Sequence, residues 1–242
     1  MSVHFAIPAT TFVLKGVIEA RLKLAYGSFT PPPVLVSPPP RPPASPPGGA
    51  AEPEAAALIL FLHHAGPNAA WRSMYDPHID ASGARIGPAP LVLDLHYMVA
   101  ALGADLEREI LLGVALSALT RNAILPRPMI QAVLASVTIP VTPTRLLDTF
   151  TAEPLSNSTS QPEQITLSQA PVDVDYSTKI WSALQSPLRP SAFFLATTVF
   201  LDPGETFPAP PIVAEVDVGI RPDPDPAATG ALDILAVGDG PS

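Results

Sequence analysis

The sequence predicts a single α/β domain, with a mixed sheet of about five strands flanked by three or four helices. Apolar residues make up 47% of the 242-residue chain and charged residues only 14%, which excludes a disordered chain. Segments with helical and with strand periodicity follow one another in mixed order. Residues 30–54 and 221–242 are too rich in proline or aspartate to join a core, so residues 1–220 are predicted to form the domain.

The first predicted element is an amphipathic helix over residues 8–25, because apolar residues recur at helical spacing between Val13 and Leu22. Both signs of charge lie on its other face, which favours a packed helix over a membrane anchor. Residues 30–54 hold two triple prolines and a Gly-Gly pair, so this insertion is predicted to be a loop with a short strand at residues 34–36. The insertion also fits a polyproline ligand for an adaptor domain.

Two apolar runs in the middle of the chain, residues 56–64 and 91–97, predict buried strands. They lack regular alternation, which is typical of strands that are covered on both faces. The first run is predicted to end in a turn at Gly66-Pro67-Asn68. A helix with one broad apolar face is predicted over residues 106–119, and a shorter helix, begun by a proline, over residues 126–135.

The last third of the chain predicts three further strands and one helix. Residues 164–167 alternate as a strand does, and residues 173–185 have helical spacing. Residues 191–201 are rich in aromatic and β-branched side chains, which favour a strand. Residues 212–220 alternate between apolar and polar side chains and predict the last strand. The acidic tail that follows is predicted to be mobile or to dock on a partner.

Charge and composition argue against several classes of function. The net charge of −9 and the lack of any basic run argue against a nucleic-acid partner. The lack of cysteine removes disulfides, zinc–thiolate sites and thiol catalysis. The longest apolar run, residues 55–62, is far shorter than the ~20 residues that cross a bilayer, and Lys15 and Glu19 interrupt any secretion signal. We therefore expect neither a membrane partner nor export by the general route.

Three groups of polar residues could carry chemistry. His63 and His64 are neighbours in a strand, so they are predicted to point to opposite faces and not to share a metal. Residues 76–80 combine carboxylates and an imidazole at a spacing that matches no standard metal loop. Asp94 and His96 lie on one face of a strand, but no nucleophile accompanies them at a readable spacing. The sequence therefore predicts no catalytic residue, no metal and no cofactor.

The order of several short motifs resembles one known protein family. In chain order the motifs are Pro67-Asn68 and Arg72 after a strand, the strand Leu91-Val92-Leu93-Asp94-Leu95-His96-Tyr97-Met98, the helix residues Leu112-Gly113, Ile180-Trp181, and Leu188-Arg189-Pro190-Ser191 before a long strand. Together they are similar to the N-terminal domain of the cap proteins of extracellular contractile injection systems, of the antifeeding-prophage and virulence-cassette type. The likeness spans residues 7–202. The long proline-rich insertion, and Leu188 where an aromatic residue is usual, depart from the family.

This resemblance implies a fold like that of phage tail-terminator proteins and a structural function without catalysis. The family forms a ring, taken as a hexamer, that closes the tube and sheath at the end far from the baseplate. Such a protein is assembled in the cytoplasm and then belongs to the particle. The interface candidates that the resemblance implies are Asn68, Arg72, Arg189 and Ser191, of which the two arginines are expected to pair with carboxylates of a neighbouring subunit.

Two alternatives remain open at this point. One is a small metal-dependent or hydrolytic enzyme built around Asp94, His96 and the loop at residues 76–80. The other is an adaptor that uses the proline tract of residues 30–54.

Overall fold

The computed structural model of the protein describes residues 3–41, 54–71, 78–79, 85–87, 90–138, 140 and 142–201. The strands in this part of the chain are β1 (Val34–Leu35), β2 (Ala57–Pro67), β3 (His78–Ile79), β4 (Arg85–Gly87), β5 (Leu91–Leu102), β6 (Ile124–Leu125), β7 (Ile165–Gln169) and β8 (Ser191–Leu201). The helices are α1 (Ala6–Tyr26), α2 (Glu107–Arg121), α3 (Arg127–Ala135), α4 (Glu153–Ser156) and α5 (Val174–Ala183), with 3-10 turns η1 (Val3–Phe5) and η2 (Leu146–Thr149).

The described strands form a six-stranded sheet in the order β1-β2-β5-β8-β7-β6 and a separate two-stranded sheet of β3 and β4. Among the described strands, β1 and β2 pair in parallel and the other pairings are antiparallel. The predicted mixed sheet is confirmed. The predicted strand at residues 212–220 and the tail at residues 221–242 lie outside the described residues.

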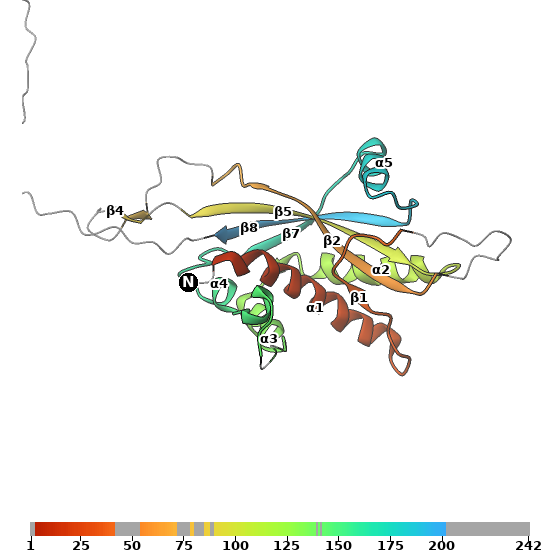
Figure 1. Ribbon diagram of the computed structural model, residues 1–242, viewed down its shortest axis with the longest axis horizontal. Coiled ribbons are helices and arrows are strands. Elements are labelled where there is room, and N and C mark those ends of the chain that lie inside the picture. Colours follow the sequence, from red (N-terminus) through yellow and green to blue (C-terminus); the bar gives the residue numbers. More distant parts are fainter. Residues whose placement is uncertain are drawn as a thin grey trace, which may run out of the picture.

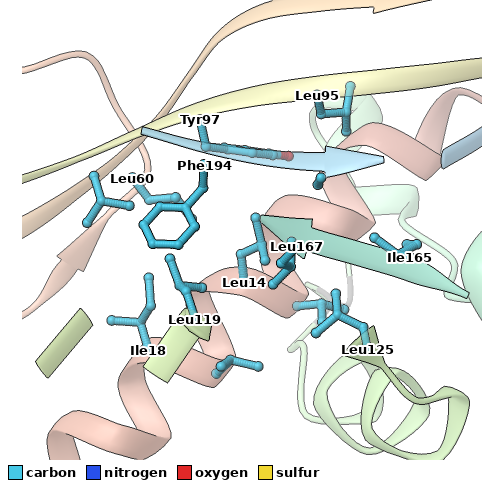
Figure 2. Close-up of a cluster of buried hydrophobic side chains, with 14 of the residues drawn as sticks. Leu14, Ile18, Leu60, Leu95, Tyr97, Leu119, Leu125, Ile165, Leu167 and Phe194 are labelled. Carbon is cyan, nitrogen blue, oxygen red and sulfur yellow. The ribbon is translucent and has the colours of Figure 1, made fainter. Parts of the chain in front are cut away.

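Helices cover the two faces of the large sheet unequally. Figure 1 shows α1, α2 and α3 together on one side of the sheet and α5 on the other side. The larger side holds most of the core, which Figure 2 shows as a cluster that joins Leu14 and Ile18 of α1 and Leu119 of α2 to Tyr97 and Phe194 of the central strands. Leu14, Ile18 and Leu119 each expose 1% or less of their surface. Burial of such side chains is the main source of the stability of this layer.

The opposite face is apolar along only half of its length. Trp181 of α5 packs there with Ile59, Met98 and Phe193 in a second, smaller cluster. Towards the start of β5 the same face carries polar and half-buried residues, including His96. The prediction that the two central strands are covered on both faces therefore holds only for the half that lies under α5.

Some predicted boundaries change in the structure. The strand predicted over residues 91–97 runs to Leu102, because pairing with β2 and β8 continues past Tyr97. The turn predicted at Gly66-Pro67-Asn68 begins later, since β2 stays paired with β5 up to Pro67. The described part of the insertion contains the expected short strand, β1, which pairs with the start of β2.

The two helical glycines Gly16 and Gly113 give a matched test of the helix packing. A Cβ at Gly16 of α1 would lie 2.5 Å from Cγ1 of Val133 on α3, whereas a Cβ at Gly113 of α2 would meet no heavy atom within 4 Å. Gly16→Ala is expected to lower the free energy of unfolding by about 1–3 kcal/mol, because β-branched Val133 cannot easily move aside. Gly113→Ala is expected to raise it by up to about 1 kcal/mol. Urea unfolding measures both, and equal effects at the two positions would contradict this packing.

Candidate functional site

The first candidate residue, Asn68, holds together the loop that follows β2. Its backbone N–H donates to the carbonyl of Val92 at 2.8 Å, and its side-chain oxygen accepts from the backbone N–H of Ala70 and of Trp71 at 2.9 and 3.2 Å. Its side-chain N–H donates to Asp94 Oδ1 at 2.7 Å. Asn68 exposes only 8% of its surface. The side chain is therefore occupied within the chain, and its contribution is to fix the shape of the loop.

Trp71 is an exposed aromatic residue of this loop. It leaves 41% of its surface in solvent, and its ring packs edge-on against Phe200 of β8 at a centroid distance of 5.3 Å. An aromatic side chain that is fixed on one side and exposed on the other is typical of protein interfaces. The sequence contained a signal for it, since Trp71 lies only three residues after Asn68 of the Pro-Asn motif. Arg72, the second candidate, lies outside the described residues.

Arg189, the third candidate, is buried and paired within the chain. Its Nε donates to both carboxylate oxygens of Glu54 at 3.0 and 3.1 Å, and Nη2 donates to Oε1 at 2.5 Å. Its Nη1 donates to Ser186 Oγ at 2.5 Å. Arg189 exposes 8% of its surface. The carboxylate that this guanidinium meets in the structure thus belongs to the same chain, and a contact with a neighbouring subunit stays a prediction.

The Arg189 cluster ties both described ends of the proline-rich insertion to one loop. Glu54 is the last residue of the predicted insertion, and Ser186 Oγ donates to the carbonyl of Pro40 at 3.0 Å. The loop after α5 therefore contacts the chain on either side of residues 42–53, which the structure does not describe. A fork of charged hydrogen bonds of this kind fixes orientation as well as distance.

Ser191, the fourth candidate, begins β8 and borders a groove of about 740 Å³. The groove lies between the start of α5, the start of β8 and the start of α2. Its lining includes Val174 and Leu188, which expose 77% and 70% of their surface, and buried Phe193. Leu188 was not among the interface candidates predicted from the sequence, although an exposed leucine at the rim of a groove is a feature of interaction surfaces.

The three described candidates fall into two groups at opposite ends of β5. Asn68 bonds to Val92 near the start of that strand, and Pro190, next to Arg189, accepts a hydrogen bond from Ala101 near its end. A strand rises about 3.3 Å per residue, so the two groups are about 30 Å apart. The structure brings Arg189 and Ser191 together and keeps both of them away from Asn68.

The histidines contradict one prediction from the sequence. A β-bulge between Leu62 and His64 breaks the alternation of β2. His63 and His64 therefore both approach His96, with ring centroids 6.0 and 5.1 Å apart, instead of pointing to opposite faces. Partial burial, and then the neighbouring imidazoles, lower the pKa of His63 to about 4, and burial lowers that of His96. The described residues contain no group of three or more ligands suited to a metal ion.

The possible catalytic pair of Asp94 and His96 does not form in the described structure. The Asp94 carboxylate accepts a hydrogen bond from Asn68, while His96 lies among the other two imidazoles. Of the loop at residues 76–80, the structure describes only His78 and Ile79, which form the short strand β3. In the described geometry Asp94 and His96 each have other partners, so they do not form an acid–base couple.

Comparisons with known proteins give one family. The family model described as the Pvc16 N-terminal domain matches residues 10–215. Two solved structures are similar at 14% identity: a sheath/tube terminator of the PVC extracellular contractile injection system in its extended state (TM-score 0.47) and the tube-terminating cap of the anti-feeding prophage (TM-score 0.43). The matches cover 85% and 84% of this chain but only 62% and 59% of those chains. No curated protein matches the chain.

The pair of Arg189 and Glu54 is expected to contribute measurably to stability. Replacing Arg189 by alanine should lower the free energy of unfolding by about 2–3 kcal/mol, because it removes several charged hydrogen bonds in a buried position. The control is Lys179→Ala, which breaks the exposed pair of Lys179 and Asp175 and should cost no more than about 0.5 kcal/mol. Urea unfolding of both variants and of Glu54→Gln measures these changes in the free energy of unfolding. If Arg189→Ala lowered it as little as the control does, the pair of Arg189 and Glu54 would not contribute to stability.

The lowered pKa of His63 predicts that acid destabilises the protein. Unfolded histidine binds a proton near its ordinary pKa of 6.5, whereas His63 in the folded chain does so near pH 4. Stability contributed by neutral His63 is thus complete above pH 6.5 and is lost as the pH falls from 6.5 towards 4. His63→Gln should therefore reduce the fall in Tm between pH 7.5 and 5 by a few degrees, since about 1 kcal/mol shifts Tm by about 2–4 °C in a chain of this size. An unchanged fall in Tm would show that His63 is not the group responsible.

Proposed function

The chain belongs to the family of the Pvc16 N-terminal domain, and on this premise we propose that it is the structural cap of a contractile, phage-tail-like injection particle. The observation that carries the proposal is the extent of the family match. It runs from residue 10 to residue 215 and so includes nearly all of α1 and every described strand. The ordered motifs around Asn68, Tyr97, Trp181 and Arg189 support the same conclusion. In this role the protein closes the tube and sheath at the end distal to the baseplate.

The placement of the candidate loops supports a closed ring. In a ring built from head-to-tail contacts, each subunit presents two different surfaces, one to each neighbour. The loop at Asn68 and Trp71 and the groove at Leu188 and Ser191 are two such surfaces, about 30 Å apart along β5. In the proposal one loop of each subunit meets the groove of the next, and six subunits close the ring.

The internal hydrogen bonds of Asn68 and Arg189 suit positioning residues in this ring. Each fixes the shape of a loop, and the neighbouring exposed side chains, Trp71 and Leu188, make the contact. Arg72 retains the role of pairing with a carboxylate of the neighbour. A preformed loop loses little conformational entropy when it binds, which strengthens an interface without additional contacts.

Besides the lateral contacts within the ring, the proposed function requires contacts with the tube and sheath along the axis of the particle. A cap must match the last ring of the particle on one face and refuse further rings on the other. We infer that strand addition, at a sheet edge or through the acidic tail at residues 221–242, engages the sheath. The subunit assembles in the cytoplasm and stays with the particle. None of the described helices is long and apolar enough to cross a membrane.

The proposed role needs no catalysis. The carboxylate of Asp94 is engaged by Asn68, and His96 contacts two other imidazoles, so neither supports the alternative of a hydrolytic enzyme.

An Asp94→Ala/His96→Ala variant that still restores particles of normal length would separate assembly from any chemistry at this site. Deleting residues 37–49 tests the adaptor alternative in the same way, because assembly should survive the loss of these prolines.

Deletion of the gene tests the proposed function directly. Particles made without the protein should be absent, unstable or of uncontrolled length in negative-stain micrographs, because no subunit closes the distal end. The intact gene supplied in trans should restore a narrow length distribution. Particles of normal number and length in the deletion strain would contradict the proposed cap function.

Charge reversal at Arg72 tests the ring. Arg72→Glu should prevent complementation and reduce ring-sized oligomers, because it replaces attraction to a neighbour's carboxylate by repulsion. The Tm should change little. The matched control is Arg121→Glu, a reversal at the exposed end of α2, which should still complement. Full complementation by Arg72→Glu would remove this residue from the interface.

A further inference from the structure

The outer edge of β2 is open over most of its length in the described structure. β5 pairs with β2 from Ala57 to Pro67 on one side. On the other side β1 pairs only with Leu58 and Ile59. From Leu60 to Pro67, no described strand accepts or donates the outward-facing backbone hydrogen bonds. A long open edge without charged residues pairs readily with another strand, so proteins usually cover it.

The chain contains a segment suited to this edge. Residues 212–220, outside the described part of the chain, read Ile-Val-Ala-Glu-Val-Asp-Val-Gly-Ile. The even-numbered positions are all apolar, namely Ile212, Ala214, Val216, Val218 and Ile220. Between them lie both acidic residues, Glu215 and Asp217. This period of two is typical of a strand with one face on a core and the other face in solvent.

We propose that residues 212–220 form an antiparallel strand along Leu60–Pro67 of the same chain. The inference concerns the domain itself and does not depend on the proposed function. It completes the sheet on the side where β1 stops. It also leaves residues 221–242 as the segment that extends beyond the sheet towards a partner.

The end of β8 lies close enough to this edge. Leu201, the last residue of β8, pairs with Leu91 of β5, and Pro67, the last residue of β2, pairs with Leu93 of the same strand. The chain therefore leaves the sheet at the end where β2 also ends. The new position is three strand spacings away, or about 14 Å. The ten residues 202–211 reach up to about 33 Å, which is ample.

The direction of the chain is also correct. β8 and β2 are both antiparallel to β5, so they run the same way. A segment that leaves the end of β8 and returns along β2 therefore runs antiparallel to β2. The short linker keeps its local concentration high, which favours pairing within one chain over pairing between two chains. The family match continues past the end of β8 to residue 215 and so includes the start of the segment.

The two faces of the segment match the two faces of β2. Leu62 belongs to the helix side, where it packs against the main core, so the even-numbered apolar row extends that layer. His63 and His64 lie on the other face, beside His96. Glu215 and Asp217 then come next to these imidazoles. The carboxylates there can accept hydrogen bonds from the imidazole N–H groups. The opposite orientation would expose the apolar row to solvent.

Paired cysteines test the register, because the native chain has none. Ala65 pairs with Leu95, which belongs to the helix-side core, so Ala65 shares the apolar face. Ala65→Cys is combined in turn with a cysteine at each position from 212 to 220 and oxidised with diamide. We expect an intramolecular disulfide at one or two even-numbered positions and none at their odd-numbered neighbours. Ser168→Cys on β7, near the opposite edge, is the control and should form none in any combination.

Mass spectrometry of a mixture of unlabelled and ¹⁵N-labelled chains separates the outcomes. A disulfide within one chain, confined to even positions, supports the proposal. Disulfides found only between chains would overturn it in favour of strand exchange between two copies. Absence of any disulfide, or equal yields at odd and even positions, would show that the segment does not lie along β2.

Hydrogen exchange gives a readout that needs no cysteine. Val216→Pro removes a backbone donor and should speed exchange of the amides in Leu60–Pro67 at least tenfold, without unfolding β8. Ala227→Pro, in the tail beyond the segment, is the matched control and should leave these amides unchanged. Unaltered exchange in the Val216→Pro variant would contradict the proposed pairing.

Discussion

Pairing along the whole of β5 is the constraint on which the rest of the structure depends. This strand of twelve residues bonds to β2 on one side and to β8 on the other, and both partners stay in register over most of its length. One of its faces is buried by α1 and α2, and half of the other face is buried by α5. Because a strand alternates its side chains, a slip of one residue would expose the core face. The register of β5 therefore fixes the positions of both candidate loops.

Two bulges modify this regular frame where the polar residues lie. One interrupts β2 between Leu62 and His64, and the other interrupts the pairing of β5 with β8 between Leu93 and Leu95. A bulge re-aims the side chains next to it. The first brings two adjacent histidines to one face, and the second lies at Asp94, whose carboxylate bonds to Asn68. The polar end of the sheet thus differs from its apolar end through two local insertions rather than through a change of fold.

The Arg189 cluster fixes a surface loop through charged hydrogen bonds in a buried position. A buried guanidinium loses its hydrogen bonds to water, and well-placed acceptors must replace them. Glu54 and Ser186 supply these acceptors. Arg189 and Glu54 are 135 positions apart in the sequence, so the pair joins distant segments of the chain. In the proposed ring, this loop would present the exposed side chain of Leu188 to a neighbouring subunit in one geometry. At the other end of β5, the hydrogen bonds of Asn68 fix the loop that carries the exposed side chain of Trp71.

The sequence by itself determined the elements: the long helix α1, the strands β2, β5 and β8, and α5 with its buried Trp181 all follow from periodicity and propensity. It also pointed to the loops at Asn68 and Arg189, through motifs that resemble a family. Only the tertiary structure decided which partners these residues meet. Glu54 reaches Arg189 and Asn68 reaches Asp94 through contacts between distant segments, and the bulge at His64 reverses the face predicted from strict alternation. Such contacts depend on register and long-range pairing, which local patterns of residue types do not specify.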